Sequence, residues 1–95
     1  MRLRWTPPAL THIAEIHDHI AKDSPGAARR VVTQIRKDAG LLLEQPSMGR
    51  PGRIEGTREL VVSRCPFIIA YRVDGDEIPI LAVIHTARRW PEQLP

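Results

Sequence analysis

Residues 56–91 read GTRELVVSRCPFIIAYRVDGDEIPILAVIHTARRWP, the part of the chain richest in residues that favour strands. Short apolar runs separated by polar residues predict three consecutive strands, at residues 58–62, 66–73 and 78–86. Asp74 and Gly75 lie between the second and third runs, and this pair is typical of a tight hairpin turn. The stretch therefore predicts a three-stranded antiparallel meander.

The third predicted strand carries apolar residues on both of its faces. One face holds Ile78, Ile80, Ala82 and Ile84, and the other holds Leu81, Val83 and His85. A strand that is apolar on both faces is usually covered on both faces and flanked by other strands. We therefore expect this strand to lie in the interior of the sheet.

Two helices are predicted upstream of the meander, at residues 7–22 and from residue 25 to about residue 43. Thr6 and Ser24 each stand directly before a proline, and a hydroxyl residue followed by proline is a common start signal of a helix. Apolar residues recur at helical spacing in both segments. The pattern predicts a helical hairpin that packs against one face of the sheet.

The opening residues, Arg2 to Trp5, alternate basic and apolar side chains and predict a further short strand. We expect this strand to pair at one edge of the sheet or beside the last strand. The resulting fold class is α+β: an N-terminal strand, a two-helix antiparallel hairpin and a three-stranded antiparallel meander. The helices pack on one face of the sheet, and residues 1–95 form a single domain.

Composition narrows the class of protein. With 42% hydrophobic and 26% charged residues, the chain is typical of folded globular proteins and not of disordered ones. No apolar run approaches the roughly 20 residues of a membrane span, and the N-terminus has no signal-peptide core. The single Cys65 leaves no internal disulfide. We therefore expect a cytoplasmic protein without a membrane partner.

Three histidines, His12, His17 and His19, lie on the first predicted helix. They are not separated by four residues, and no cysteine or acidic cluster with the spacing of metal ligands accompanies them. We therefore expect them to face solvent, and we expect neither a metal site nor a cofactor.

Arginine dominates the basic residues, since twelve of the fourteen are arginine and the formal net charge is +3. The loop at residues 45–56 contains Arg50 and Arg53 together with two prolines and three glycines. Arginine forms forked contacts with carboxylates and phosphates, so the composition favours an anionic partner. At so small a net charge, the alternative is ordinary solubilising charge.

Several motifs follow one another in an informative order. They are GTRELV at 56–61, PFIIAYRV at 66–73, ILAVIH at 80–85 and RRWP at 88–91, preceded by RLRWTPPAL at 2–10 and GRPG at 49–52. In this order and spacing they resemble the RelE/ParE superfamily of toxins over nearly the whole chain. The resemblance implies a growth-inhibiting toxin of a bacterial type II toxin–antitoxin system, of the kind that serves plasmid stabilisation. A cognate antitoxin would neutralise it in a hetero-oligomeric complex.

The superfamily divides by target. RelE-like members cleave messenger RNA in the ribosome, whereas ParE-like members act on DNA gyrase. RelE-like nucleases commonly have an arginine in the middle strand, and Ile68 occupies the matching position here. The chain also lacks the lysine-rich run before the first strand of the meander, and Trp90-Pro91 replaces the C-terminal tyrosine. The resemblance is therefore closer to ParE-like members, with gyrase as the expected target.

Two other functions stay open at this point. One is a ribosome-dependent messenger RNA endoribonuclease, in which His85 would act as general base or acid and Arg88 and Arg89 would hold the phosphate. The other is a degenerate toxin that retains only antitoxin binding. Without catalysis, His85 would end a buried strand with its ring hydrogen-bonded.

The candidate residues for binding the target or the antitoxin form a separate set, spread over the loop, the meander and the C-terminal tail. They are Arg50, Arg53, Arg58, Arg72 and Trp90. Because most of this set is cationic, we expect the antitoxin segment that binds here to be acidic and amphipathic.

Overall fold

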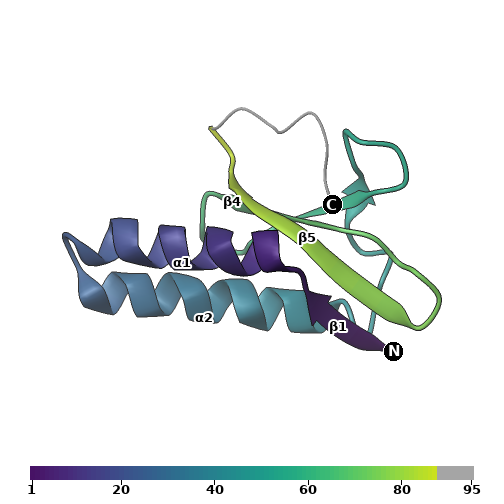
Figure 1. Ribbon diagram of the computed structural model, residues 1–95, viewed down its shortest axis with the longest axis horizontal. Helices are drawn as coiled ribbons and strands as arrows, with labels where there is room; N and C mark the ends of the chain where they lie inside the picture. Colours follow the sequence, from purple (N-terminus) through teal and green to yellow (C-terminus); the bar gives the residue numbers. More distant parts are fainter. Residues whose placement is uncertain (88–95) are drawn as a thin grey trace.

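A computed structural model describes residues 1–87 of the chain. Two helices and a five-stranded sheet make up its secondary structure (Figure 1). In chain order the elements are β1 (Arg2–Trp5), α1 (Pro7–Ala21), α2 (Pro25–Leu41), β2 (Arg50–Pro51), β3 (Arg58–Val61), β4 (Phe67–Tyr71) and β5 (Glu77–His85). The predicted α+β class and the predicted order of the elements are confirmed.

The strands lie in the order β1-β5-β4-β3-β2. β3, β4 and β5 form the predicted antiparallel meander, and β1 pairs in parallel with β5 at one edge. β5 is therefore an interior strand, as its two apolar faces indicate. β2 was not predicted: two residues of the loop, Arg50 and Pro51, pair with Glu59 and Arg58 at the opposite edge.

Side-chain caps fix the start of each helix where the sequence predicts it. Thr6 Oγ1 accepts a hydrogen bond from the Ala9 amide at 3.4 Å and donates one to the Ile80 carbonyl at 2.7 Å. Ser24 Oγ accepts from the Ala27 amide at 3.2 Å. Both helices end slightly earlier than predicted, α1 at Ala21 and α2 at Leu41. Residues 42–44 form a turn after α2. Thr6 thus joins the start of α1 to β5.

The turn between β4 and β5 differs in detail from the prediction. Asp74 and Glu77 exchange backbone hydrogen bonds of 2.8 and 3.0 Å, so Gly75 and Asp76 form the two-residue loop. Gly75 has a φ of 60°, and this left-handed conformation at the first loop position favours glycine.

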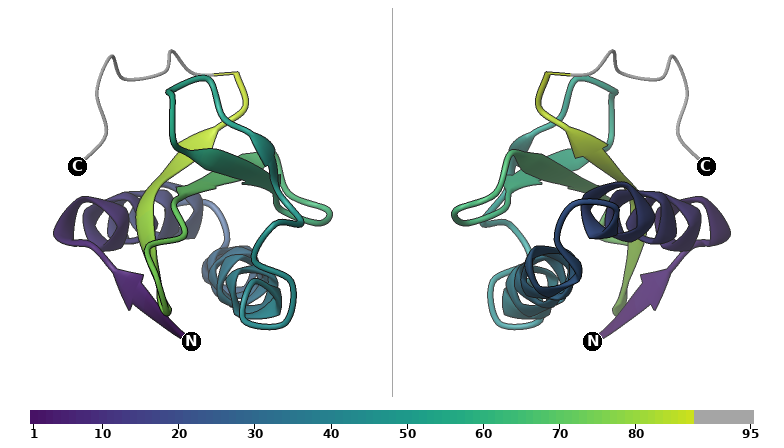
Figure 2. Two further views of the ribbon diagram at one scale, coloured as in Figure 1. Left: turned by 90° about the vertical axis from the view of Figure 1, so that its right-hand side faces the viewer. Right: turned by 90° about the vertical axis from the view of Figure 1, so that its left-hand side faces the viewer.

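The two helices lie side by side on one face of the sheet (Figures 1 and 2). The core fills the space between these layers, and its members alternate along β3 and β4 with residues of the other face. On β5 the register shifts opposite Ala70 and Tyr71, so Ile78, Ile80 and Val83 belong to the core while Ala82 and Ile84 lie on the other face. This corrects the predicted grouping of Ile78, Ile80, Ala82 and Ile84 on one face. The largest fully buried side chains of the core include Ile35 and Leu42 from the region of α2, and Ile69, Tyr71, Ile78 and Ile80 from the sheet. We call the side of the sheet that packs against the helices the helix face, and the opposite side the open face.

Each helix also supplies a side chain to a backbone amide of the sheet. On α1, His12 Nδ1 accepts from the Val83 amide of β5 at 3.2 Å, beyond the point where β1 ends. On α2, the buried Asp38 accepts from the Ser63 amide, after β3, at 2.6 Å. His12 is therefore half-buried and bonded, which corrects the expectation that it faces solvent.

Within residues 1–87, no helix is long and apolar enough to cross a membrane. The same residues contain no group of three or more histidine, cysteine or acidic side chains that could hold a metal ion.

Candidate functional site

The open face has a centre of small apolar side chains. Ala70 pairs with Ala82, and Ile68 pairs with Ile84, across β4 and β5. Ala70, Ala82 and Ile84 form a cluster separate from the core under the helices. Beside this centre, Glu59 of β3 pairs with Ala70, so its carboxylate lies on the same face.

Glu59 is a buried carboxylate, with 2% of its side chain exposed. Its Oε1 accepts from Arg50 Nη2 at 3.1 Å, and its Oε2 accepts from the Arg53 amide at 2.8 Å. The Arg53 Nε lies 3.8 Å from the same Oε2. The side chains of Arg50 and Arg53 are 57% and 52% exposed. Glu59 therefore holds two outward-reaching guanidinium groups at the edge of the open face.

Arg72 joins these two arginines on the open face. Its amide donates to the Pro79 carbonyl at 3.2 Å, and alternation from the buried Tyr71 directs its side chain to this side of the sheet. Its Nη2 lies 3.3 Å from Asp74 Oδ2. We call Arg50, Arg53 and Arg72 the arginine rim. The structure thus brings three of the five predicted binding residues to one face.

The N-terminal strand adds two cations that the sequence did not single out. Arg4 Nε donates to Glu77 Oε1 at 3.0 Å, and Arg2 lies 3.9 Å from the same oxygen. Because Leu3 and Trp5 pack on the helix face, Arg2 and Arg4 lie on the open face. The open face is therefore cationic beyond the rim as well.

Arg58, the fourth predicted binding residue, holds the loop in place. Its side chain lies on the helix face, and Nη1 donates to the Gly49 carbonyl at 2.8 Å and to the Ser47 carbonyl at 3.3 Å. These contacts occupy the guanidinium within the fold. Trp90, the fifth, lies outside the described residues.

Tyr71 anchors the same part of the loop as Arg58. Its buried hydroxyl donates to the Pro46 carbonyl at 2.7 Å and accepts from the Gly49 amide at 3.0 Å. A Cβ on Gly49 would lie 2.6 Å from that hydroxyl, so only glycine allows this approach. Burial raises the pKa of Tyr71 above its usual value near 10, although the Gly49 bond and the charge of Arg58 oppose the shift. The loop that carries Arg50 and Arg53 is thus fixed from beneath.

His85, the candidate catalytic residue, lies away from the arginine rim. It pairs with Phe67, whose side chain belongs to the core of the helix face, and the two rings meet edge to face at 5.3 Å. His85 Nδ1 accepts from the Ala87 amide at 3.0 Å. The structure therefore places His85 on the side opposite to Arg50, Arg53 and Arg72. The other two catalytic candidates, Arg88 and Arg89, lie outside the described residues.

Ile68 occupies the position where a nuclease of the superfamily would have an arginine. Its side chain is 3% exposed and faces Ile84 across the open face. An apolar residue here can neither donate a hydrogen bond nor carry charge to a phosphate.

Besides Arg2 and Arg4, sequence reasoning missed two buried residues of the site, Glu59 and Tyr71. Both act on the loop across sequence gaps, nine residues from Glu59 to Arg50 and 25 from Tyr71 to Pro46. Local periodicity carries no signal for such contacts. The one available sign was a glutamate within a predicted strand, because a carboxylate in a sheet requires a partner.

Comparison with known proteins gives consistent results. Residues 3–90 match the family described as the ParE toxin of the type II toxin–antitoxin system parDE. The chain is 48% identical over 93 residues to the candidate toxin Y4kP of Sinorhizobium fredii, which covers 98% of this chain and 96% of that protein. It is 37% identical over 84 residues to the toxin RelE2 of Caulobacter vibrioides, and this alignment covers 88% of this chain and 93% of that protein.

A solved structure agrees with the sequence matches. The chain superimposes with a TM-score of 0.81 on a chain of the chromosomal ParDE toxin–antitoxin system from P. aeruginosa, at 33% identity. The alignment covers 90% of this chain and 95% of that chain. The family match spans nearly the whole chain, and the fold agrees with it. The protein belongs to the ParE toxin family of type II toxin–antitoxin systems.

Proposed function

We propose that this toxin inhibits growth by binding DNA gyrase and does not cleave RNA. The match to the ParE toxin family supports gyrase as the target, and the position of His85 counts against RNA cleavage. Its ring packs against Phe67 on the helix face, and its Nδ1 is already bonded to the Ala87 amide. The arginines of the rim lie on the opposite face and cannot share a substrate phosphate with it.

The chemistry of RNA cleavage supports the same conclusion. Such a site needs a base for the 2′-hydroxyl, a cation for the charged intermediate and an acid for the leaving oxygen, all within hydrogen-bond reach. Among residues 1–87, the His85 ring is hydrogen-bonded to the Ala87 amide and packs against Phe67, and neither partner is a carboxylate or a guanidinium. Ile68 leaves the middle strand without a cation.

An antitoxin is the partner that the family implies, and the arginine rim is where we propose that it binds. Arg50 and Arg53 present half-exposed guanidinium groups at the edge of the open face, whose central apolar residues are buried. An acidic segment complements these charges. The resulting assembly is a hetero-oligomer of toxin and antitoxin, with Arg72 as a third contact.

The test is a pair of assays with purified, antitoxin-free toxin. One measures supercoiling of a relaxed plasmid by gyrase, and the other measures cleavage of a messenger RNA on stalled ribosomes. We expect inhibited supercoiling and intact RNA. Cleaved RNA with normal supercoiling would contradict the proposal in favour of the endoribonuclease, a result that the similarity to the toxin RelE2 makes worth testing. Failure in both assays would identify a degenerate toxin.

Two variants locate the activity. His85→Ala removes the imidazole, and we expect it to leave supercoiling inhibition within about twofold, because the ring serves packing. Arg50→Ala in the same assay reports whether the rim meets the target as well as the antitoxin. A circular dichroism spectrum of each variant shows that the fold is retained. Loss of all activity in a folded His85→Ala protein would restore this residue as a catalytic candidate.

A further inference from the structure

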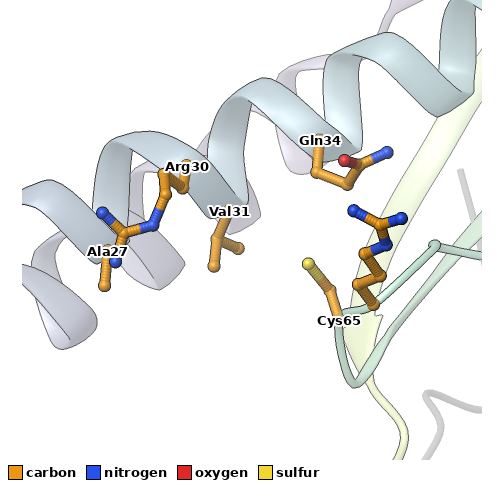
Figure 3. A pocket seen from close by; sticks show the side chains of 6 residues that line it. Ala27, Arg30, Val31, Gln34 and Cys65 are labelled. Atoms are coloured by element: carbon orange, nitrogen blue, oxygen red, sulfur yellow. The ribbon is translucent and has the colours of Figure 1, made fainter.

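A groove runs between α2 and the turn that joins β3 to β4, on the helix side of the sheet. It has a volume of about 390 Å³, and its lining residues are Ala27, Arg30, Val31, Gln34, Arg64 and Cys65. Figure 3 shows Val31 pointing from α2, and Cys65 pointing from the turn, into the same space. Both side chains also pack against the core, so the floor of the groove is apolar and supported from below.

The walls of this groove are cationic. Arg30 and Arg64 are exposed, and they stand on its two sides, one on α2 and the other on the turn. A neighbouring hollow on α2 adds Arg29 and Lys37, and no acidic residue lines either space within residues 1–87. The acidic residue of α2, Asp38, is buried and bonded to Ser63.

An apolar floor between cationic walls selects a particular kind of ligand. A nucleic acid would use the charges but would gain little from Val31 and Cys65, because its phosphates need water or donors around them. An amphipathic peptide uses both features: an apolar side chain enters the groove, and carboxylates on either side of it meet Arg30 and Arg64.

We propose that this groove is a second anchoring site for the antitoxin, occupied by an acidic amphipathic segment. The proposal rests on the antitoxin partnership described above. The groove lies on the helix side of the sheet and the arginine rim on the open face, so a bound antitoxin spans the edge formed by β2 and β3. A chain held at two points binds with the second contact at high effective concentration.

Charge reversal tests the walls. Arg30→Glu and Arg64→Glu are compared with Lys22→Glu, an exposed residue that lines neither space and carries the same charge change. Calorimetric titration with the cognate antitoxin gives the dissociation constants. We expect each groove variant to weaken binding by about tenfold, with a smaller salt dependence, and Lys22→Glu to stay within about twofold.

Cys65, the only cysteine of the chain, reports directly on the floor. Its alkylation by iodoacetamide is followed by mass spectrometry in the free toxin and in the complex with a cysteine-free antitoxin. Burial raises the pKa of the Cys65 thiol, and the charge of Asp38 adds to the shift, so the rates are compared at one fixed pH. We expect the antitoxin to slow alkylation at least about tenfold.

The outcomes separate the two proposals. If the wild-type toxin does not bind the antitoxin, the proposed function fails. If it binds, but both groove variants match Lys22→Glu and alkylation is unchanged, the groove proposal alone fails. Protection of Cys65 that rises with toxin concentration, without antitoxin, would also overturn it and would assign the groove to contacts between toxin copies.

Discussion

The two faces of the sheet carry different kinds of side chain, although the same strands supply both. On the helix face, Ile69 and Tyr71 of β4 are fully buried within a core of large side chains. On the open face, Ala70 stands between them in sequence and lies beside the buried carboxylate of Glu59. One face therefore provides stability through apolar volume, and the other holds charged groups in fixed positions at its edge. Substitutions on the two faces should differ in kind as well as in size.

The largest effect is expected at Ile69. Replacing Ile69 with alanine removes a fully buried side chain from the core, and we expect a loss of about 2–5 kcal/mol in the free energy of unfolding. Urea denaturation followed by circular dichroism measures it. The control is Val61→Ala on the open face, where the side chain is 51% exposed, and we expect a change of about 0.5 kcal/mol or less. Equal costs at the two positions would contradict the distinction between the faces.

Tyr71→Phe should have the second largest effect. The ring stays in the core, but the Pro46 carbonyl and the Gly49 amide lose their partner, at a cost of about 1–3 kcal/mol. Hydrogen exchange should show faster exchange of the Gly49 amide, because the loop loses its anchor. Unchanged exchange there would mean that Arg58 alone fixes the loop.

The same hydroxyl gives a pH dependence. Because the pKa of Tyr71 is raised in the folded state, folding favours the protonated phenol. Its contribution is fully present below the unfolded value near 10 and is lost as the pH rises from there through the folded value. Urea midpoints between pH 9 and pH 11 should therefore fall more steeply for the wild type than for Tyr71→Phe. Parallel curves would rule out this tyrosine as the source.

Glu59→Gln measures how much a buried charge on the open face contributes to stability. The amide keeps the shape of the side chain and can still accept from the Arg53 amide, but it loses the charge that holds Arg50. We expect a cost of about 1 kcal/mol, smaller than for an ion pair buried on both sides, because both arginines reach solvent. Thermal denaturation at low and high salt measures it. A loss as large as that of Ile69→Ala would show that the open face also carries the fold.

Arg50→Ala should have the smallest effect on stability. Arg50 is 57% exposed, and the Arg53 amide still holds the other oxygen of the buried Glu59, so we expect a loss below about 1 kcal/mol, with the fold intact. The affinity for the antitoxin should nevertheless fall about fivefold or more, as titration calorimetry can show. An unchanged affinity would remove Arg50 from the binding surface and leave Arg53 and Arg72 as the remaining rim.

Local signals predicted most of the fold. Thr6 and Ser24 begin the two helices, as a hydroxyl before proline indicates, and the runs after Gly56 form the meander. β2 escaped prediction because Arg50 and Pro51 form a strand only through pairing with β3, and nothing in their own sequence favours a strand.

The candidate site was only partly predictable, for the same reason. Arg50, Arg53 and Arg72 could be selected by charge, but the carboxylate that orients two of them could not. Arg58 carries the same charge as these three arginines but has a different role. Its side chain points to the helix face of β3 and binds the loop there. His12 was assigned to solvent because the amide that it meets lies 71 residues away. Contacts between distant parts of the chain decide all of these cases.

The parallel pairing of β1 with β5 has a consequence for the time course of folding. Thr6 and Ile80, which meet through a hydrogen bond, are 74 residues apart, so the first strand to be synthesised is fixed only after the last one exists. At about 5–20 residues per second, synthesis of the chain takes roughly 5–19 s. We expect no complete sheet, and hence no toxic surface, during this interval. We therefore expect the nascent toxin to be inactive until its final strand has left the ribosome.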